Sequence, residues 1–552
     1  MEKAWLNFNN QQYLENKRLA ADLVTKINTS SLSLVFERNK LKINRLPLEF
    51  IGRFDFLKDG YDMDFAIKTG KTDFKNLFTA LPPAYVSWVE KKKVQGDMDI
   101  AATLKGKYIA KETIAPTLLF DLKVEKGFVS AKTAKEPARD VNVDFHFKLP
   151  GLNPDSMQVD LDSAHIAIGE KFLQGAAHIK GMAAFVDGHF KGEVDLQQLN
   201  EVFGDTDSLQ LRGMYRFNAV FKGKYSKGIN QQRIHPDTII TSIPTFSIQS
   251  SLKDGYLKYY NLPEALKEIN FTLDAFCNDN NYEHTNIRLD NLNAKALNNF
   301  IKGFVHVNGL ENFPVDADLK TKFNLADIKS FYPVKDIDLK GNLDVDIVTK
   351  GNYNSKENKF PVTNAIINLK DGYVKTASYP EPLTNIQVEA AITAVSASLK
   401  DLQVNLKPVS FEFAGNPFTV TSDLKDFNNL DYHIASKGTL DIGKLYKLFA
   451  IKGYDLNGLV RTDFVFNGTQ ADAVVGRYGK LSNKGTLELQ NIQLISDLFP
   501  KPFLIKSGAF HFNNDQLIAD DLKLNYGSSN ASLKGYFTNI INYFLTPGEV
   551  LK

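Results

Sequence analysis

A pair of glycines ten residues apart recurs four times along the chain and constrains the fold more than any other feature. The copies run from Gly96 to Gly106, Gly213 to Gly223, Gly341 to Gly351 and Gly458 to Gly468. Their starts lie roughly 120 residues apart, a period that indicates tandem supersecondary units sharing one continuous core. The chain is therefore expected to be a repeat protein.

Between the two glycines of each copy, apolar side chains occupy nearly every second position, and most of the others are polar. This period of two predicts a strand with one apolar and one polar face. The bracketing glycines predict tight turns or bulges, where a side chain would obstruct the backbone. The larger apolar side chains of the four strands are Met98, Ile100, Leu104, Tyr215, Phe217, Phe221, Leu343, Val345, Ile347, Val460, Phe464 and Phe466.

Other elements keep a fixed order relative to that strand. A turn-and-strand pattern is centred on Gly127, Gly255 and Gly372, with a weaker version near Ile492. A hairpin-like pattern follows it, for instance at residues 287–309, 402–426 and 517–537.

A short segment then follows Asp or Asn with apolar residues three to four apart, which predicts a capped helical turn. These segments cover residues 72–83, 194–203, 324–333 and 440–449. Each unit is expected to hold about eight antiparallel strands and one short helix. The expected divisions are 1–95 (the back part of a unit), 96–212, 213–340, 341–457 and 458–552 (an incomplete last unit without a closing helix).

Composition narrows the functional classes. The 552 residues carry 66 Lys and Arg against 64 Asp and Glu, a net charge of +2 with the signs mixed, so nothing favours a nucleic-acid partner. Cys277 is the only cysteine, which excludes an intramolecular disulfide. No stretch approaches the roughly 18 to 20 apolar residues of a membrane span, and the first residues do not resemble a signal peptide.

Motifs of catalysis, cofactor binding and metal binding were sought and none is convincing. The Gly70-Lys71-Thr72 segment lacks the earlier glycine of a phosphate loop, since Phe65 stands in its place. Cross-strand histidines are a possible metal set, but the other units have no equivalents, so solvated residues on the polar face are the preferred interpretation. These histidines are His146, His165, His178 and His189. We expect no enzyme, no cofactor and no metal.

The end section, residues 485–537, resembles the AsmA family of Gram-negative envelope proteins. The resemblance rests on a strand with Gly485 and Leu487, a proline-containing crossing, and Gly508 opening the next strand. It continues with Leu522, Leu524, Gly527 to Ser529 and Leu533-Lys534-Gly535. The earlier units resemble the upstream repeats of that family, so the resemblance covers essentially the whole chain.

The resemblance implies a long twisted β-sheet curled into a groove with an apolar floor. It also implies a periplasmic protein, anchored in the inner membrane by an N-terminal helix, that moves phospholipids between the inner and outer membranes and maintains the outer membrane. This chain lacks such a helix and opens on what resembles the back half of a unit. We therefore expect a fragment of a longer protein, with any anchor upstream.

The fold is accordingly predicted to be mainly β, an elongated tandem-repeat antiparallel sheet curled into a groove. The groove would be lined by the apolar set given above and would hold phospholipid acyl chains. Small Ala102 and Ala219 interrupt the larger residues, which favours open space. The alternative is a structural envelope spacer or adhesin-like β-solenoid without lipid. A β-helix enzyme acting on polysaccharide is a third hypothesis, disfavoured because the carboxylates are spread through all units.

Overall fold

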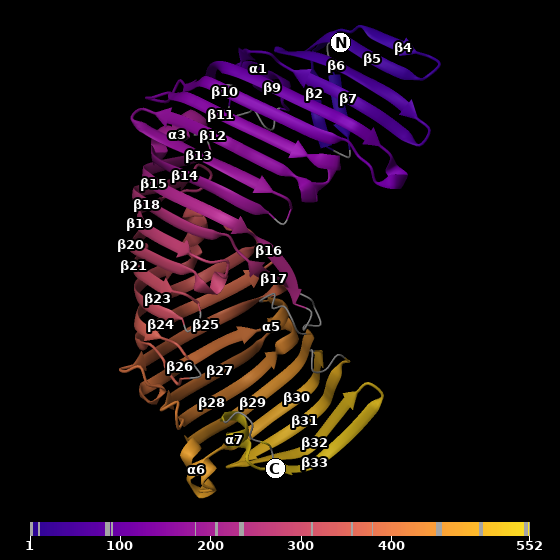
Figure 1. Ribbon diagram of the computed structural model, residues 1–552. Coiled ribbons are helices and arrows are strands. Elements are labelled where there is room, and N and C mark those ends of the chain that lie inside the picture. The colour runs from indigo at the N-terminus through magenta and orange to yellow at the C-terminus, as the bar shows by residue number, and fades with distance from the viewer. Residues whose placement is uncertain are drawn as a thin grey trace. The chain divides into compact units, whose positions relative to one another are not determined.

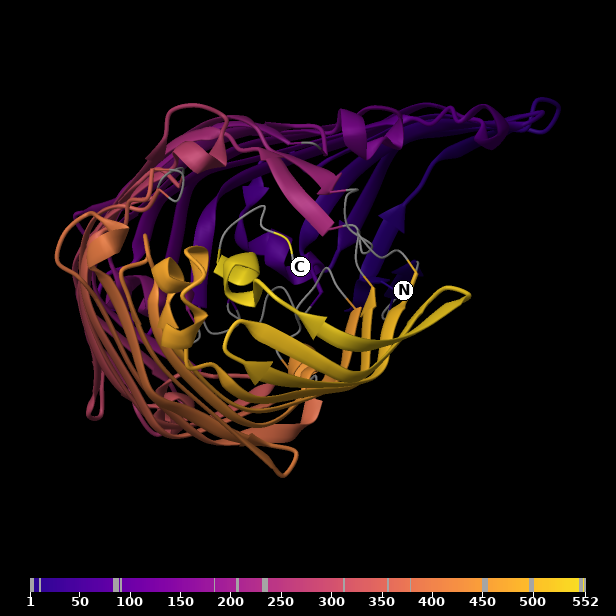
Figure 2. The ribbon, with the colours of Figure 1, turned by 90° about the horizontal axis from the view of Figure 1, so that it is seen from below.

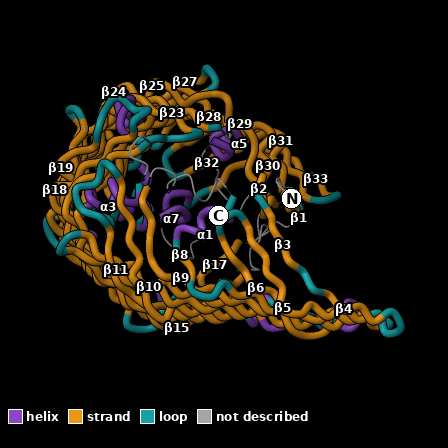
Figure 3. The backbone as a smooth tube through the Cα atoms, turned by 90° about the horizontal axis from the view of Figure 1, so that it is seen from above, coloured by secondary structure: helices purple, strands orange, loops and turns teal. Residues whose placement is uncertain are grey.

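Strand dominates the structure, a computed structural model in which helices are few and short (Figure 3). It is 71% strand and contains one antiparallel sheet of 29 strands that is not closed, which confirms the mainly-β prediction. The residues that the structure describes are 4–8, 11–82, 89, 92–182, 184–204, 208–230, 237–310, 313–354, 357–377, 379–448, 455–495, 501–545 and 550.

The chain divides into two compact units. Unit 1 comprises Met1–Ser226, Ile240–Asn261 and Thr272–Tyr282, and unit 2 comprises Lys227–Ile239, Leu262–Phe271 and Glu283–Lys552. One strand, β19 (Leu266–Cys277), contributes residues to both. Strands β16 (Ser226–Asn230) and β17 (Asp237–Ser242) form a two-stranded sheet of their own.

In unit 1, strands lie side by side in chain order from β9 to β15 (Figure 1). β3 and β4 both pair with β5, β8 pairs with β9, and β1 (Ala4–Phe8) and β2 (Gln11–Lys17) form a separate pair. The strands of the ladder are β3 (Leu19–Asp22), β4 (Thr25–Asn28), β5 (Ser33–Ile43), β6 (Leu46–Leu57), β7 (Gly60–Lys68), β8 (Thr72–Asp73), β9 (Lys92–Tyr108), β10 (Thr117–Ala131), β11 (Ala138–Leu149), β12 (Gln158–Ile168), β13 (Lys171–Lys180), β14 (Phe185–Asp195), β15 (Leu209–Lys224) and β18 (Thr245–Tyr259).

In unit 2, each strand from β20 onward pairs antiparallel with the next one along the chain. The ladder comprises β20 (Asn286–Ala296), β21 (Asn299–Asn308), β22 (Pro314–Asn324), β23 (Ile337–Asn352), β24 (Val362–Thr376), β25 (Tyr379–Ala394), β26 (Leu402–Phe413), β27 (Asn416–Lys425), β28 (Asp431–Asp441), β29 (Asp455–Thr469), β30 (Lys484–Ile495), β31 (Phe503–Asn513), β32 (Gln516–Tyr526) and β33 (Ser529–Phe537).

Each glycine-pair segment is a strand, as predicted: β9, β15, β23 and β29. Counted from such a strand to the next short helix, the ladder holds six strands, for example β9 to β14 and β23 to β28. The expectation of about eight strands per repeat was wrong. The long turn-and-strand and hairpin segments account for four of the six strands.

The short helices fall where the sequence predicts them, as α1 (Lys75–Ala80), α3 (Leu196–Phe203), α4 (Ile328–Phe331) and α5 (Ile442–Leu448). Acidic or amide side chains cap them: Asp195 accepts from the backbone N–H groups of Gln197 and Gln198, and Asp441 accepts from that of Lys444. Two helices were not predicted, α6 (Gln470–Val474) and α7 (Ile540–Leu545). The expectation that the last repeat lacks a helix after its hairpin was wrong.

The first glycine of each pair lies at a β-bulge, which confirms the expectation for that glycine, whereas the second glycine pairs in regular register, as Gly351 does with Val315. The register shifts beside Gly96, Gly213, Gly341 and Gly458. Gly341 shows why glycine is needed: its φ is +117°, and an added Cβ would lie 2.8 Å from the Cα of Gly372 on the next strand. The same close approach joins Gly458 to Ile492, which the sequence had matched as the weaker copy.

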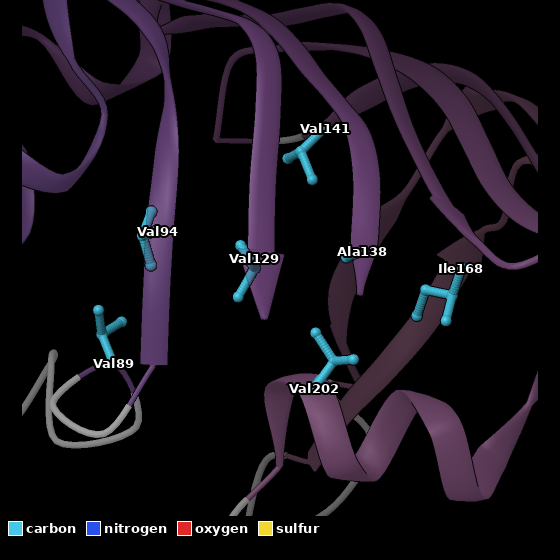
Figure 4. Close-up of a cluster of buried hydrophobic side chains, with 7 residues drawn as sticks. All are labelled: Val89, Val94, Val129, Ala138, Val141, Ile168 and Val202. Carbon is cyan, nitrogen blue, oxygen red and sulfur yellow. The ribbon is translucent and has the colours of Figure 1, made fainter. Parts of the chain in front are cut away.

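In unit 1 the short helices α1 and α3 cover the strand ends around the bulges. In unit 1, Val202 of α3 points at the ends of β9 to β12 (Figure 4). The buried cluster there is Val89, Val94, Val129, Ala138, Val141, Ile168 and Val202. Because bulges bend strands and helices add a second layer, each repeat builds a small two-layer core at one end of its strands.

Candidate functional site: the apolar face of the sheet

The predicted apolar residues share one face of the sheet, and polar residues of the same strands occupy the other. In β15, Arg216, Asn218 and Val220 are exposed, whereas the predicted Tyr215, Phe217 and Phe221 are half-buried. β9, β23 and β29 alternate in the same way over most of their length. We call the side of the sheet that carries Tyr215, Phe217 and Phe221 the apolar face, and the other side the polar face.

Pairing lines up the apolar side chains in unit 1 into a continuous row across eight strands. The row begins at Ile100 on β9 and ends at Phe246 on β18. Its members in order are Ile100, Leu122, Phe145, Leu161, Ala177, Gly188, Phe221 and Phe246. Two predicted residues far apart in the sequence, Ile100 and Phe221, thus belong to one row.

Unit 2 carries a longer row, across twelve strands from β22 to β33. It is Phe323, Leu343, Leu369, Val388, Val409, Val420, Ser436, Phe464, Gly485, Phe512, Leu517 and Phe537. Its one polar side chain is satisfied, because the Ser436 and Thr462 hydroxyls hydrogen-bond at 2.8 Å. The predicted Leu343 and Phe464 lie in this row, with Val345, Ile347, Val460 and Phe466 in the neighbouring positions of β23 and β29.

The apolar face is not covered by a second layer along most of its length. The accessible surface is 31766 Å². A compact protein of this 61.9 kDa mass would expose about 20,000 Å², and two compact halves about 24,000 Å². The excess therefore does not depend on how the two units are arranged.

Phenylalanine burial gives the same result residue by residue. The chain has 40 phenylalanines, and among the described residues only Phe331, Phe413 and Phe510 are fully buried. Phenylalanine is among the residues most often buried in compact folds. On the apolar face phenylalanine rings instead contact each other in half-exposed pairs: the ring centroids of Phe190 and Phe221 lie 6.0 Å apart.

Met98 differs from the other predicted residues. It is 1% exposed and packs against Leu46, Ala80 and Val124, beside α1. It belongs to the helix-covered core, so it is not accessible to a ligand on the apolar face. Ile100 lies at the edge of the same cluster, and Leu104, four residues further along β9, is half-buried outside it.

Near the end of unit 2 the apolar face is covered by the chain itself. Ile540 and Ile541 of α7 are buried with Tyr432, Ala473 of α6 and Leu481, and the aromatic rings of Phe466 and Phe512 pack against this cluster. In Figure 2, α7 lies over the last strands of the unit. This cover was not predicted, although Asn539 followed by Ile-Ile-Asn-Tyr-Phe-Leu has the capping residue and apolar spacing of a short helix.

The polar face of unit 1 carries a row of alternating acids and bases directly beside the apolar row. Its members are Asp121, His146, Asp160, His178, Asp187 and Lys222. Asp187 and Lys222 form an ion pair of 2.7 Å. Nearby, hydrogen bonds from Arg216 and Lys171 lower the pKa of Glu193 to about 2.

Two of the four predicted histidines come together on that face. His146 Nδ1 lies 2.5 Å from Asp121 Oδ1, and this hydrogen bond raises the pKa of His146. Asp162 lies 3.5 Å from His146 and 3.9 Å from His178, so it links the two rings.

The other two histidines do not join this cluster. His165 Nδ1 contacts the carbonyl oxygen of Asp140, and His189 lies on β14 opposite Ala176. Within the described ranges, no group of His, Cys, Asp or Glu side chains has the geometry to hold a metal ion. The charged side chains described here on the polar face therefore pair between neighbouring strands, and this pairing stabilises the sheet.

No family model, curated protein or solved structure matches the chain. Of the helices in the described part of the chain, none has the length and apolar character needed to cross a membrane.

Proposed function

We propose that the protein is an AsmA-like, non-enzymatic carrier of phospholipids in the periplasm. In this proposal the sheet curls into a groove, and acyl chains lie on the apolar face while headgroups stay in water. The lipids pass between the inner and outer membranes and support assembly of the outer membrane. No reacting group is needed, because lipids would slide along the apolar rows.

The observation that carries this proposal is the large apolar face that the protein leaves without a second layer. Exposed apolar surface of this extent in a water-soluble fold usually marks an interaction site. In unit 2 the row of twelve strands, at roughly 4.8 Å per strand, is about 50 Å long, and the part of it that α6 and α7 leave uncovered is the proposed floor. Acyl chains fit such a floor, since they require apolar contact and no directional partner.

The test is site-specific photocrosslinking to lipid in cells of a Gram-negative host. A photoreactive phenylalanine analogue placed at Phe221 or at Ile347 is expected to crosslink phospholipid. The matched controls are Val220 and Val348, which are exposed neighbours on the polar face of the same strands. Mass spectrometry of organic extracts of the purified protein then counts and identifies the lipids.

Crosslinks at Phe221 and Ile347 but not at the control positions would support the proposal. Equal crosslinking on both faces would indicate adsorbed membrane and contradict it. A folded, monodisperse protein with no lipid would favour the structural spacer or adhesin-like solenoid. The cover that α6 and α7 provide over the last strands is the one observation that favours this alternative, because it shows that the chain can close its own apolar face.

A further inference from the structure

We infer that the free edge of β33 is a docking site for an extended segment of a partner protein, which adds to the sheet as one more antiparallel strand. This inference concerns a strand edge and does not rest on lipid binding.

The repeat itself shows what is missing beside β33. In the complete repeats the fifth strand, β13, β21 or β27, is followed by a sixth, β14, β22 or β28, which pairs with it antiparallel. By its pairing with β32, β33 is the fifth strand of the last repeat: Leu533 pairs with Leu522 as Val420 pairs with Val409 in β27. After β33 the chain enters α7, and within the described residues β33 pairs with β32 alone.

Exposure confirms that this edge is open. Every residue from Ser529 to Tyr536 is exposed, whereas the equivalent β27 is mostly half-buried. Leu533 on the apolar face is 43% exposed and Tyr536 on the polar face is 66% exposed. Figure 1 shows β33 as the last strand of the ladder that runs through β30, β31 and β32.

The edge has little of the protection that natural edge strands carry: Lys534 is its only charge, and the bulge in its pairing, between Ala519 and Leu522, lies on β32. Natural edges are usually short, or carry several charges, a proline or a bulge. β33 has nine residues, no proline, and Lys534 as its single charge. Its backbone donors and acceptors are thus available over a length that suits strand addition.

The complete repeats specify which side chains the added strand carries. At the one position equivalent to Leu533, each of the three complete repeats pairs a smaller residue with a larger one across the fifth and sixth strands. Gly175 pairs with Phe190, Gly303 with Leu319, and Val420 with Ser436. Opposite Leu533, the equivalent position, we therefore expect a small residue, with apolar residues alternating on both sides of it.

This size rule also argues against β33 of a second copy as the occupant. Antiparallel pairing of two β33 strands centred on Leu533 would place leucine opposite leucine, where the complete repeats never place two large side chains. The first strands of a second copy, β3 and β4, have only four residues each. A partner protein that offers a longer alternating segment fits the edge better.

The experiment uses the full chain and a fluorescent peptide with the sequence of β28, residues 431–441, as the probe. Saturable binding is expected by fluorescence anisotropy, with amide hydrogen exchange slowed in residues 529–537. Leu533→Lys, which places a charge on the apolar face of the edge, is expected to weaken binding on the order of tenfold. Tyr536→Lys is the matched control on the polar face and is expected to bind normally.

Two further measurements keep the inference falsifiable. A peptide with Ser436→Phe places a large residue opposite Leu533 and is expected to bind more weakly than the unmodified peptide. Absence of saturable binding, or binding that Leu533→Lys leaves unchanged, would overturn the inference. A concentration-dependent dimer in sedimentation, with residues 529–537 protected without peptide, would assign the edge to a second copy instead.

Discussion

The two ends of the same strands in unit 1 differ in burial although their sequence pattern is the same. On β9, Val94 is buried under α3, whereas Leu104 at the other end of the strand is half-buried on the open apolar face. Both residues belong to the apolar positions of the strand's alternating pattern. The difference arises because α1 and α3 cover the end of β9 around the bulge at Gly96 and leave the other end open.

A strand pattern therefore specifies which face is apolar, but not what covers it. Covered apolar residues contribute to folding because they leave water in the folded state. Uncovered ones contribute less to folding and leave apolar surface for a ligand. Substitutions at covered and uncovered positions are therefore expected to differ in their effects on stability and on ligand binding.

The largest effect is expected on the covered side. Val202 on α3 is 0% exposed, so Val202→Asp buries an unpaired charge in the cluster of Figure 4 and is expected to reduce the free energy of unfolding by about 4 kcal/mol. Denaturant unfolding followed by circular dichroism measures this loss. A loss below about 1 kcal/mol would show that α3 is not part of the folded core.

The next largest effect is expected from substituting a bulge glycine beside the covered strand ends. In unit 2, Gly341→Ala places a Cβ 2.8 Å from the Cα of Gly372 at a φ of +117°. We expect a loss of about 2 to 3 kcal/mol, because neither backbone can move without breaking the ladder. Gly479→Ala is the matched control, since nothing lies within 4 Å of the added Cβ. Equal effects of the two substitutions would remove the bulge from the explanation of the fold.

The sequence predicted the parts of the structure that local chemistry determines. Glycine pairs, alternation and Asp or Asn caps identified the four repeat strands, their bulges and the four short helices, because each depends on residues close together in the chain. The predicted number of strands per repeat was wrong, because the sequence of a long hairpin segment does not show where one strand ends and the next begins.

The candidate site was only partly predictable for a different reason. Core and open face share one alternating pattern, so the sequence did not separate Met98, a core residue, from Leu104 on the open face. The cover over the end of unit 2 depends on Ile540 meeting Tyr432 more than a hundred residues away, which no local pattern reveals. The cross-strand rows likewise follow from register, which pairs Phe221 with Gly188.

A smaller effect on stability is expected on the open side. Phe221→Asp places a charge on a half-exposed position, so we expect a loss of about 1 kcal/mol or less, well below that of Val202→Asp. If the proposed function is right, the same substitution removes most of the bound phospholipid. Val220→Asp, at a neighbouring position that is 47% exposed on the polar face, is expected to keep both stability and lipid. Lipid lost equally in both variants would contradict an apolar-face path.

The smallest effect is expected on the polar face, where charges lie in water. His146 faces Asp121 of β10, Asp144 of β11 and Asp162 of β12, and its raised pKa means that the folded state binds a proton more tightly than the unfolded state. Its stabilisation is therefore fully present below about pH 6.5 and is lost as the pH rises through the folded-state pKa. Because the ring is partly exposed, screening limits the effect to a few tenths of a kcal/mol. His146→Gln is expected to flatten the fall in unfolding midpoint between pH 6 and pH 9, and added salt to flatten it similarly in the unmodified protein. A pH dependence that survives both changes would place the titrating group elsewhere and leave the paired polar row without a measurable share in stability.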